Sequence, residues 1–124
     1  MSHAGPAILI VDDDPDIAIS VSDVLTDMGY QTDIAGDGQS ALDLVRNRSY
    51  DVALLDFKMP EMDGVALYQQ IQKLRPTIVA IMVTAYAGSD GVNRARNAGT
   101  WKVLRKPVDL DTLLGLIEEA VGSR

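Results

Sequence analysis

The sequence predicts a single α/β domain with a doubly wound parallel sheet. Short apolar runs of strand length alternate with longer segments of helical periodicity, and neither a linker nor an internal repeat interrupts the alternation. A chain of 124 residues, 47% of them hydrophobic, is long enough to bury one core. Five strands and five helices in alternation favour right-handed crossovers, which put helices on both faces of the sheet.

The five predicted strands fall into two kinds. Four are apolar runs, as expected of strands covered on both faces: Ala7–Val11 and residues 52–55, 78–83 and 103–104. The fifth, Gln31–Ala35, is short and half polar, so we expect it at an edge of the sheet.

Apolar residues three or four positions apart predict one helix after each strand. For the first two helices these residues are Ile17, Val21, Val24, Leu25 and Met28, and then Ala41, Leu42 and Val45. For the third and the fifth they are Leu67, Ile71 and Leu74, and then Leu110, Leu113, Leu114, Ile117 and Val121. The fourth helix, within residues 88–98, is only weakly periodic, through Val92, Ala95 and Ala98.

Capping and stop residues set the expected ends of these helices. Gly29 follows the first helix where a C-terminal glycine belongs, and Pro76 stops the third. We expect Asp14 to cap the first helix, and Asp109 or Asp111 to cap the last.

Composition excludes several classes of protein. Without cysteine the chain can form no disulfide, thiol nucleophile or thiolate metal site. The one histidine, His3, lies near the start of the chain, which argues against a Ser-His-Asp triad or a histidine metal cluster. The net charge of -7 argues against direct binding to nucleic acid.

No targeting or membrane segment is predicted. The apolar runs are far shorter than the roughly 20 residues of a membrane span, and residues 1–6 lack the basic and apolar regions of a secretory signal. We expect a cytoplasmic protein with one domain over residues 7–121, a disordered tail at 1–6 and a short C-terminal tail at 122–124.

Polar side chains stand where the apolar strands end. Asp12 and Asp13 follow the first strand, Asp56 follows residues 52–55, Thr84 follows the third apolar run and Lys106 the last. Because the carboxyl ends of parallel strands meet at one edge of a sheet, we expect these side chains to gather there. Oxygen ligands suit Mg²⁺, and an aspartate can accept a phosphoryl group as an acyl phosphate. The sequence therefore predicts a site for a divalent cation and a phosphoryl group.

Four motifs in order carry a family resemblance. They are Asp12-Asp13, Asp56 with Met59-Pro60 and Met62-Asp63-Gly64, Thr84-Ala85, and Lys106-Pro107. Asp56 lies 43 positions after Asp13, Thr84 lies 28 after Asp56, and Lys106 lies 22 after Thr84. With these motifs the chain resembles the receiver domain of bacterial two-component response regulators, the CheY-like superfamily, from Ala7 to about Val121. The resemblance implies a flavodoxin-like sheet with strand order 2-1-3-4-5.

The resemblance implies how a metal ion and a phosphoryl group would be bound. Asp56 would accept the phosphoryl group from a phosphohistidine on a histidine kinase or histidine phosphotransfer protein. Asp13 and Asp56 would bind Mg²⁺, or Mn²⁺ in its place, together with the backbone carbonyl of Lys58. Asp12 would help to bind the metal ion, either directly or through a water.

The remaining site residues also take roles from the resemblance. Lys106 and Thr84 would contact the phosphoryl oxygens, and the bond between Lys106 and Pro107 would be cis. From their positions, Lys58 and Tyr86 should flank the entry to the site. We expect both side chains to shield the phosphoryl group from water and so to modulate its lifetime. The alternative is that the Lys58 ammonium attracts the leaving phosphate and speeds its loss.

The resemblance implies a signalling switch with weak self-phosphatase activity rather than a metabolic enzyme. Such a domain is a monomer or a weak phosphorylation-dependent dimer, with no membrane contact. Its partner surface would involve the fourth helix, the last strand and the last helix; candidate contributors are Arg94, Arg96, Trp101 and Lys102. The chain could be a complete regulator or a piece of a longer regulator or hybrid kinase.

One position departs from the family pattern. Three residues before Lys106, where the family usually has an aromatic switch residue, this chain has Val103. Trp101 and Tyr86 are the nearest aromatic residues, but their positions do not match. The route by which a phosphorylation signal would leave the site is therefore open.

Two alternative interpretations remain. Residues 36–41 fit the pattern G-x-G-x-x-A of a dinucleotide site, but they follow the polar edge strand and carry Asp37 where a pyrophosphate would lie. The stronger alternative is a small phosphatase of the haloacid-dehalogenase type, with Asp12 as the nucleophile. That interpretation leaves Asp56 without a role, and 124 residues leave little room for a cap domain.

Overall fold

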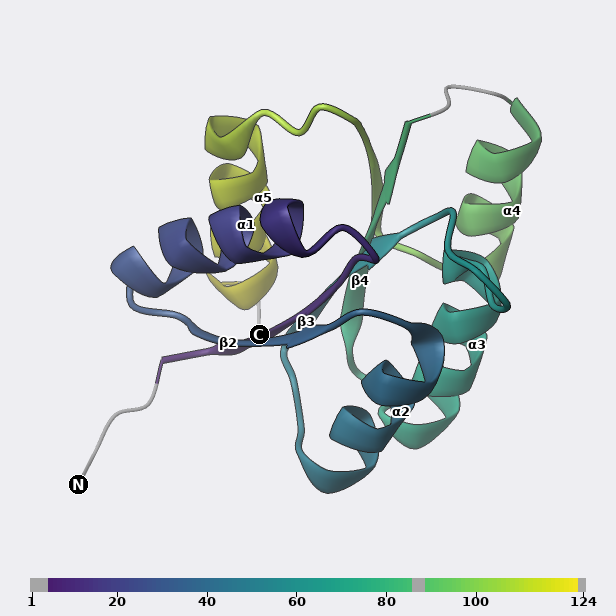
Figure 1. Cartoon of the computed structure of the whole chain (residues 1–124), viewed down its shortest axis with the longest axis horizontal. Helices are drawn as coiled ribbons and strands as arrows, with labels where there is room; N and C mark the ends of the chain where they lie inside the picture. The colour runs from purple at the N-terminus through teal and green to yellow at the C-terminus, as the bar shows by residue number, and fades with distance from the viewer. Residues whose placement is uncertain (1–4, 86–88, 123–124) are drawn as a thin grey trace.

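The computed structural model describes residues 5–85 and 89–122 and has the predicted α/β architecture (Figure 1). Within these residues, parallel strands form one sheet in the order β2-β1-β3-β4-β5, as the resemblance implies. The strands are β1 (Ala7–Val11), β2 (Gln31–Ala35), β3 (Val52–Asp56), β4 (Val79–Thr84) and β5 (Lys102–Arg105). The helices are α1 (Pro15–Asp27), α2 (Gly38–Asn47), α3 (Gly64–Leu74), α4 (Ser89–Ala98) and α5 (Leu110–Gly122). None of the described helices combines the length and the apolar composition of a membrane span.

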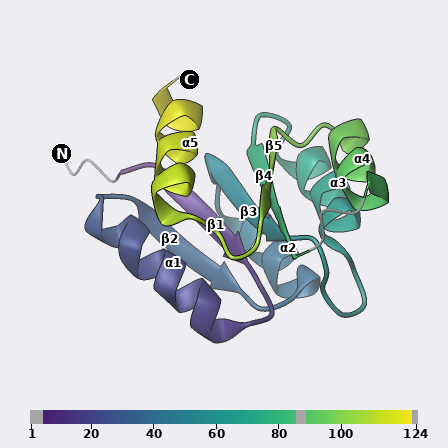
Figure 2. The ribbon, with the colours of Figure 1, turned by 90° about the horizontal axis from the view of Figure 1, so that it is seen from above.

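Helices cover both faces of the sheet, with α1 and α5 on one face and α2, α3 and α4 on the other (Figures 1 and 2). Successive strand residues alternate between the two faces. Leu9 packs with the α2–α4 side, and Ile8 and Ile10 pack with the α1–α5 side. The residues of β1 and β3 are all buried, whereas most of those in β2 are half-buried. The prediction that β2 is an edge strand is confirmed.

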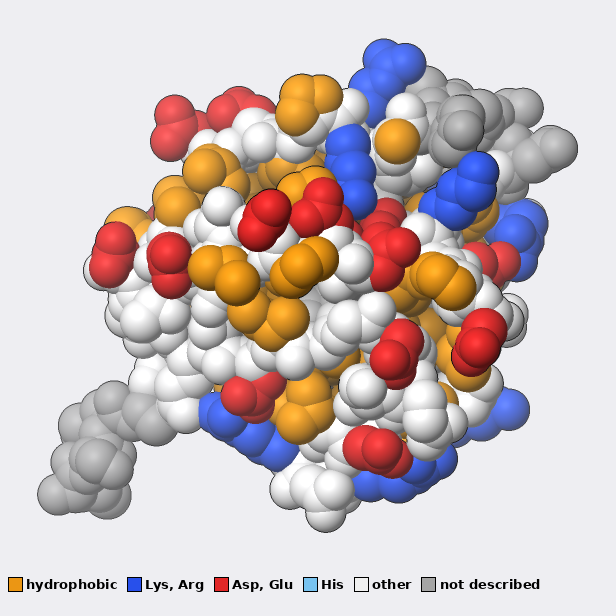
Figure 3. Space-filling model, in the orientation of Figure 1, with side chains coloured by type: hydrophobic (Ala, Val, Ile, Leu, Met, Phe, Trp, Pro, Cys, Tyr) orange, Lys and Arg blue, Asp and Glu red, His pale blue; other side chains and the backbone are white. Residues whose placement is uncertain are grey.

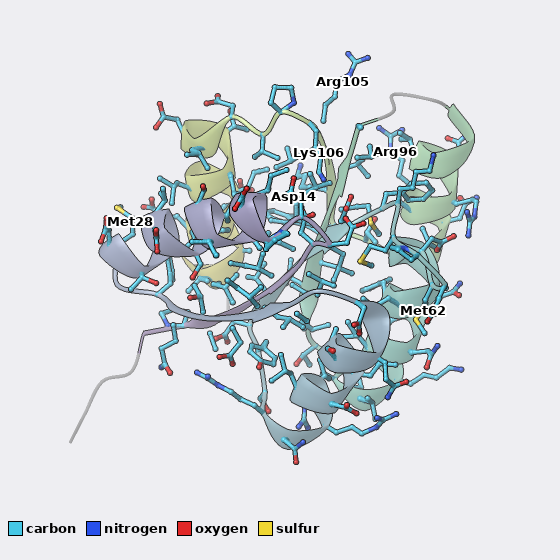
Figure 4. All side chains as sticks on the ribbon, viewed as in Figure 1. Asp14, Met28, Met62, Arg96, Arg105 and Lys106 are labelled. Atoms are coloured by element: carbon cyan, nitrogen blue, oxygen red, sulfur yellow. The ribbon has the colours of Figure 1, made fainter. Side chains whose placement is uncertain are left out.

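The inward face of α1 differs from the predicted one. Ala18, Val21 and Leu25 are buried against the sheet, whereas Ile17 is 39% exposed and Met28 is 61% exposed. Figure 4 shows Met28 at the end of α1 that lies farthest from Asp14. The prediction for Ile17 and Met28 is wrong because two apolar stripes lie one residue apart on this helix. The small side chain of Ala18 lets α1 pack closely, and its stripe is the one that turns inward.

The ends of α1 and α5 follow from their capping residues. The Asp14 carboxylate accepts hydrogen bonds from two backbone N–H groups of α1, at 3.0 and 3.4 Å. Gly29 has a φ of +95°, the left-handed conformation that favours glycine after a helix. Asp109 immediately precedes α5 and accepts a hydrogen bond from the Thr112 hydroxyl at 2.6 Å, whereas Asp111 lies in the first turn.

The weakly periodic segment forms a helix, as predicted. In α4, Ala95 is buried in the core, and Val92 and Ala98 are half-buried. The Thr100 hydroxyl donates a hydrogen bond to the Ala95 carbonyl at 2.8 Å, and Gly99 has a φ of +97°. Few large apolar residues are needed here because α4 covers only the edge of the α2–α4 face.

Gly64, at the start of α3, occupies a position without space for a side chain. A Cβ atom there would lie 2.6 Å from the Asp56 carbonyl oxygen and 2.7 Å from the Met82 sulfur. We therefore expect Gly64→Ala to lower the free energy of unfolding by about 1–3 kcal/mol. In Gly115→Ala, the matched control inside α5, the new Cβ would meet no described atom within 4 Å, helix backbone aside. The control should gain up to about 1 kcal/mol. Urea denaturation measures both, and equal midpoints would contradict this explanation.

Candidate functional site

The carboxyl ends of four strands bring the predicted site residues to one edge of the sheet. Asp12 directly follows β1, Asp56 ends β3, Thr84 ends β4, and Lys106 directly follows β5. The strand register aligns these ends: Asp56 pairs with Val83, next to Thr84, and Thr84 pairs with the residue before Lys106. The sequence prediction of one polar edge is confirmed in this respect.

Three carboxylates form the acidic part of the site. Carboxylate oxygens of Asp12, Asp13 and Asp56 all lie within 4.8 Å of one another. Asp12 is 7% exposed and Asp56 is 6% exposed, whereas Asp13 is exposed at the rim. One oxygen of Asp12 is fixed because it accepts a hydrogen bond from the backbone N–H of Asp14 at 2.9 Å. The other oxygen of Asp12 faces the ammonium group of Lys106.

Lys106 joins two of the carboxylates. Its Nζ lies 3.3 Å from Asp12 Oδ2 and 3.3 Å from Asp56 Oδ1. The backbone N–H of Lys106 donates to the Thr84 carbonyl at 2.8 Å, which fixes the end of β5 against β4. The peptide bond between Lys106 and Pro107 is cis, the geometry that the resemblance implies. Figure 4 shows Lys106 above this edge, near Asp14.

Burial and repulsion perturb the central carboxylate. Burial and the nearby Asp12 carboxylate raise the pKa of Asp56 from its ordinary 3.8 to about 6, with a further contribution from Asp13, although the Lys106 ammonium opposes the shift. Burial by itself would lower the pKa of Lys106, but the Asp56 and Asp12 carboxylates outweigh it and raise that pKa. The ionised site holds three negative charges and one positive charge.

This excess of negative charge suits a cation. The donors are all carboxylate oxygens, which bind hard divalent ions such as Mg²⁺ better than soft ones. A cation would relieve the repulsion that raises the pKa of Asp56. On the face in Figure 3, several acidic side chains lie over α1, and acidic and basic side chains alternate over the rest of the surface. The cluster of Asp12, Asp13 and Asp56 can therefore hold a metal ion.

The other predicted residues differ in their burial and in the face of the sheet on which they lie. Thr84 is 6% exposed at the end of β4, and Lys58 is exposed two residues after Asp56. Tyr86 lies outside the described residues. Val103 packs with the core on the α2–α4 side, whereas Trp101 packs with the core on the α1–α5 side. Trp101 therefore lies on the wrong face of the sheet to replace an aromatic residue at position 103.

Sequence reasoning missed two features around the site. The first is a mainly apolar groove of about 540 Å³ beside Lys106, lined by Asp16, Ile17, Ser20, Val21, Lys106, Pro107, Val108 and Leu110. Ile17 and Leu110 line this groove and are 39% and 36% exposed, so the prediction that Leu110 lies on the inward face of the last helix is also wrong. The second is the ion pair between Arg94 on α4 and Asp63, 3.0 Å long. The 31 positions between its partners give no sequence signal.

The alternative sites receive no support from this geometry. Asp56 is as deeply buried as Asp12 and lies equally close to Lys106, but the phosphatase interpretation gives Asp56 no role, so that interpretation is not favoured. The glycine-containing segment at 36–41 follows the edge strand and runs into α2, and the Asp37 carboxylate accepts a hydrogen bond from the Ser40 backbone N–H at 2.7 Å. An anion at the start of α2 would meet that carboxylate.

The raised pKa of Asp56 predicts a pH dependence of stability. The folded state holds this proton more tightly than the unfolded state, so the stabilisation is fully present below about pH 4 and is lost as the pH rises through about 6. In EDTA, Asp56→Asn should match wild type near pH 4 and exceed it by about 1–3 kcal/mol at pH 7. Urea denaturation across this range tests the prediction. A difference that does not change with pH would contradict it.

Comparisons with known proteins identify the family. The family model for the response regulator receiver domain matches residues 8–118. The transcriptional regulatory protein ZraR of Escherichia coli (strain K12) is 36% identical over 122 residues, which are 98% of this chain and 28% of ZraR. The response regulator receiver protein Anae109_2439 of Anaeromyxobacter sp. (strain Fw109-5) is 38% identical over 108 residues, 87% of this chain and 45% of that protein. The chain thus spans less than half the length of these relatives.

Solved structures extend the similarity to the whole fold. A CheY-like response regulator receiver domain protein from Methanospirillum hungatei JF-1 has a TM-score of 0.92 and 37% identity, covering 96% of this chain and 95% of that chain. Vibrio cholerae chemotaxis protein CheY4 has a TM-score of 0.88 and 28% identity, covering 94% of this chain and 99% of that chain. On its family model, its relatives and its fold, the chain belongs to the response regulator receiver domain family.

Proposed function

We propose that this receiver domain accepts a phosphoryl group on Asp56 from a phosphohistidine of a histidine kinase or histidine phosphotransfer protein. Receiver domains of response regulators are signalling switches that work with kinases and output domains. One observation carries the proposal: Asp56 is a buried carboxylate with the Lys106 ammonium 3.3 Å away and two further carboxylates beside it.

The transfer would be a displacement at phosphorus. An Asp56 oxygen forms the new O–P bond while the N–P bond of the phosphohistidine breaks, and the imidazole takes the electron pair of that bond. Lys106 and the Thr84 hydroxyl would contact the transferred oxygens and offset their charge. Asp12, Asp13, Asp56 and the Lys58 carbonyl would hold Mg²⁺, or Mn²⁺, which when bound supplies positive charge next to the phosphoryl group.

The same site would also release phosphate slowly. Attack of a water on the phosphorus restores the Asp56 carboxylate, which gives the switch a weak self-phosphatase activity. Because the domain carries a net charge of -7, we propose that it makes no direct contact with nucleic acid. DNA binding, where a longer protein has it, would then belong to another domain.

The first prediction of this proposed function identifies the residue that accepts the phosphoryl group. Acetyl phosphate with Mg²⁺ should label the protein once, at Asp56, and Asp56→Asn should take up no label there because the amide cannot form the acyl phosphate. Mass spectrometry after reductive trapping of the acyl phosphate locates the modified residue. Wild-type label at Asp12 would support the phosphatase interpretation and overturn this one.

The second prediction concerns the metal ion. Millimolar Mg²⁺ should raise the melting temperature of wild type relative to EDTA, because the ion binds only the folded site. Asp13→Asn should remove most of that increase and, in EDTA, should stabilise the protein by up to about 1 kcal/mol, since a charge at the exposed rim interacts weakly. Asp23→Asn, an exposed substitution on α1, serves as the control. If Mg²⁺ shifts wild type and Asp13→Asn equally, the metal assignment fails.

The third prediction concerns the lifetime of the phosphoryl group. Lys58 is exposed two residues after Asp56, where its side chain can cover the approach of a water. We expect phosphorylated Lys58→Ala, and Tyr86→Ala, to lose phosphate faster than wild type. The measurement is the decay of labelled protein after the donor is removed. Unchanged or slower decay in both variants would argue against shielding.

A further inference from the structure

The residue after the acceptor is fixed to its neighbours on both sides. The Phe57 N–H donates to the Val83 carbonyl at 2.8 Å, and the Phe57 carbonyl accepts from the Gly64 N–H at 2.8 Å. These two bonds tie the start of the loop at residues 57–63 to β4 and to the start of α3. Because the Phe57 backbone has little freedom of its own, a displacement of Asp56 should also move the Phe57 ring.

Helix α4 rests directly on that ring. A Cβ atom at Gly91 would lie 3.0 Å from the Phe57 ring, so only a glycine lets the helix come this close without moving the ring. One turn further along α4, the Arg94 guanidinium lies 5.8 Å from the centre of the same ring. The first residue of the loop and α4 are thus in contact through two successive turns.

Arg94 also holds the far end of the loop. Its Nη2 lies 3.0 Å from Asp63 Oδ2, while Asp63 Oδ1 accepts a hydrogen bond from the Ala66 N–H at 2.8 Å and caps α3. One guanidinium therefore contacts both ends of the loop at residues 57–63.

The exposure of this contact suits a switch better than a structural support. The side chains of Arg94 and Asp63 are 53% and 31% exposed, and exposed ion pairs add little to stability. Val103 cannot supply a movable aromatic ring on this side of the sheet. From these contacts we propose that Arg94 is a positioning residue that couples the loop at residues 57–63 to α4. The coupling would carry the state of Asp56 to α4, and in this respect it rests on the proposed function.

The test is hydrogen exchange of α4 in the presence and absence of Mg²⁺ with beryllofluoride, a stable analogue of the aspartyl phosphate. In wild type, exchange should change both at residues 57–63 and in α4. In Arg94→Ala the response at residues 57–63 should persist, and the response in α4 should fall by about fivefold or more, at the low end of ordinary allosteric coupling.

Three further variants separate coupling from general damage. Arg94→Lys retains the charge and should recover part of the α4 response. Asp63→Asn retains an oxygen for the cap of α3 but loses the ion pair, so it should resemble Arg94→Ala, and the double variant should lose no more than either one. Arg96→Ala removes the same charge from an exposed site on α4 and should behave as wild type.

The possible failures are distinct. A full α4 response in Arg94→Ala would overturn the coupling and leave the proposed function intact. Equal losses in Arg94→Ala and Arg96→Ala would overturn it as well, because helix charge alone would then explain the effect. So would loss of the response at residues 57–63 in Arg94→Ala, since Arg94 would then act on the site itself. A wild type without any response at residues 57–63 would overturn the proposed function and the coupling with it.

Discussion

The repulsion between buried carboxylates at the edge of the sheet is the constraint on which the rest of this structure depends. Asp12 and Asp56 lie under 10% exposed with only one ammonium, Lys106, between them, and Asp13 adds a third charge at the rim. Stability alone does not favour this arrangement, because burial and the charges of Asp12 and Asp13 raise the cost of ionising Asp56. The same strain makes the site responsive. A bound cation would lower the repulsion, and a phosphoryl group on Asp56 would change which oxygens Lys106 can contact.

The parallel sheet makes this concentration of charge possible. Helices on both faces leave only the strand ends free, so side chains that could not lie within the sheet gather where β1, β3, β4 and β5 stop. The loops that leave this edge must then turn tightly. Gly64 shows how such a turn restricts the sequence, since only a residue without a side chain leaves space for the Asp56 carbonyl and Met82. The loop that follows Asp56 is therefore short and lies in contact with α3 and α4.

Much of this arrangement can be predicted from the sequence, because strand ends are visible as the points where apolar runs meet Asp, Thr or Lys. The edge strand, four interior strands and the order of site residues follow from that pattern. The inward face of α1 does not, since two apolar stripes one residue apart fit its sequence equally well and packing against the sheet decides between them. The ion pair of Arg94 with Asp63 is equally invisible, because it depends on how a loop and a helix meet in space.

The valine at position 103 affects how a change at the site can reach the surface. Val103 packs against the core on the α2–α4 side of the sheet and offers no aromatic ring that could move with the state of the site. The contacts between α4 and the loop after Asp56 lie on the outer surface and do not depend on the residue at position 103. They are half-exposed, so they can form and break with little change in the stability of the core. A receiver domain without the aromatic residue can thus keep a rigid interior and place its adjustable contacts next to Asp56, where phosphorylation would change the charge.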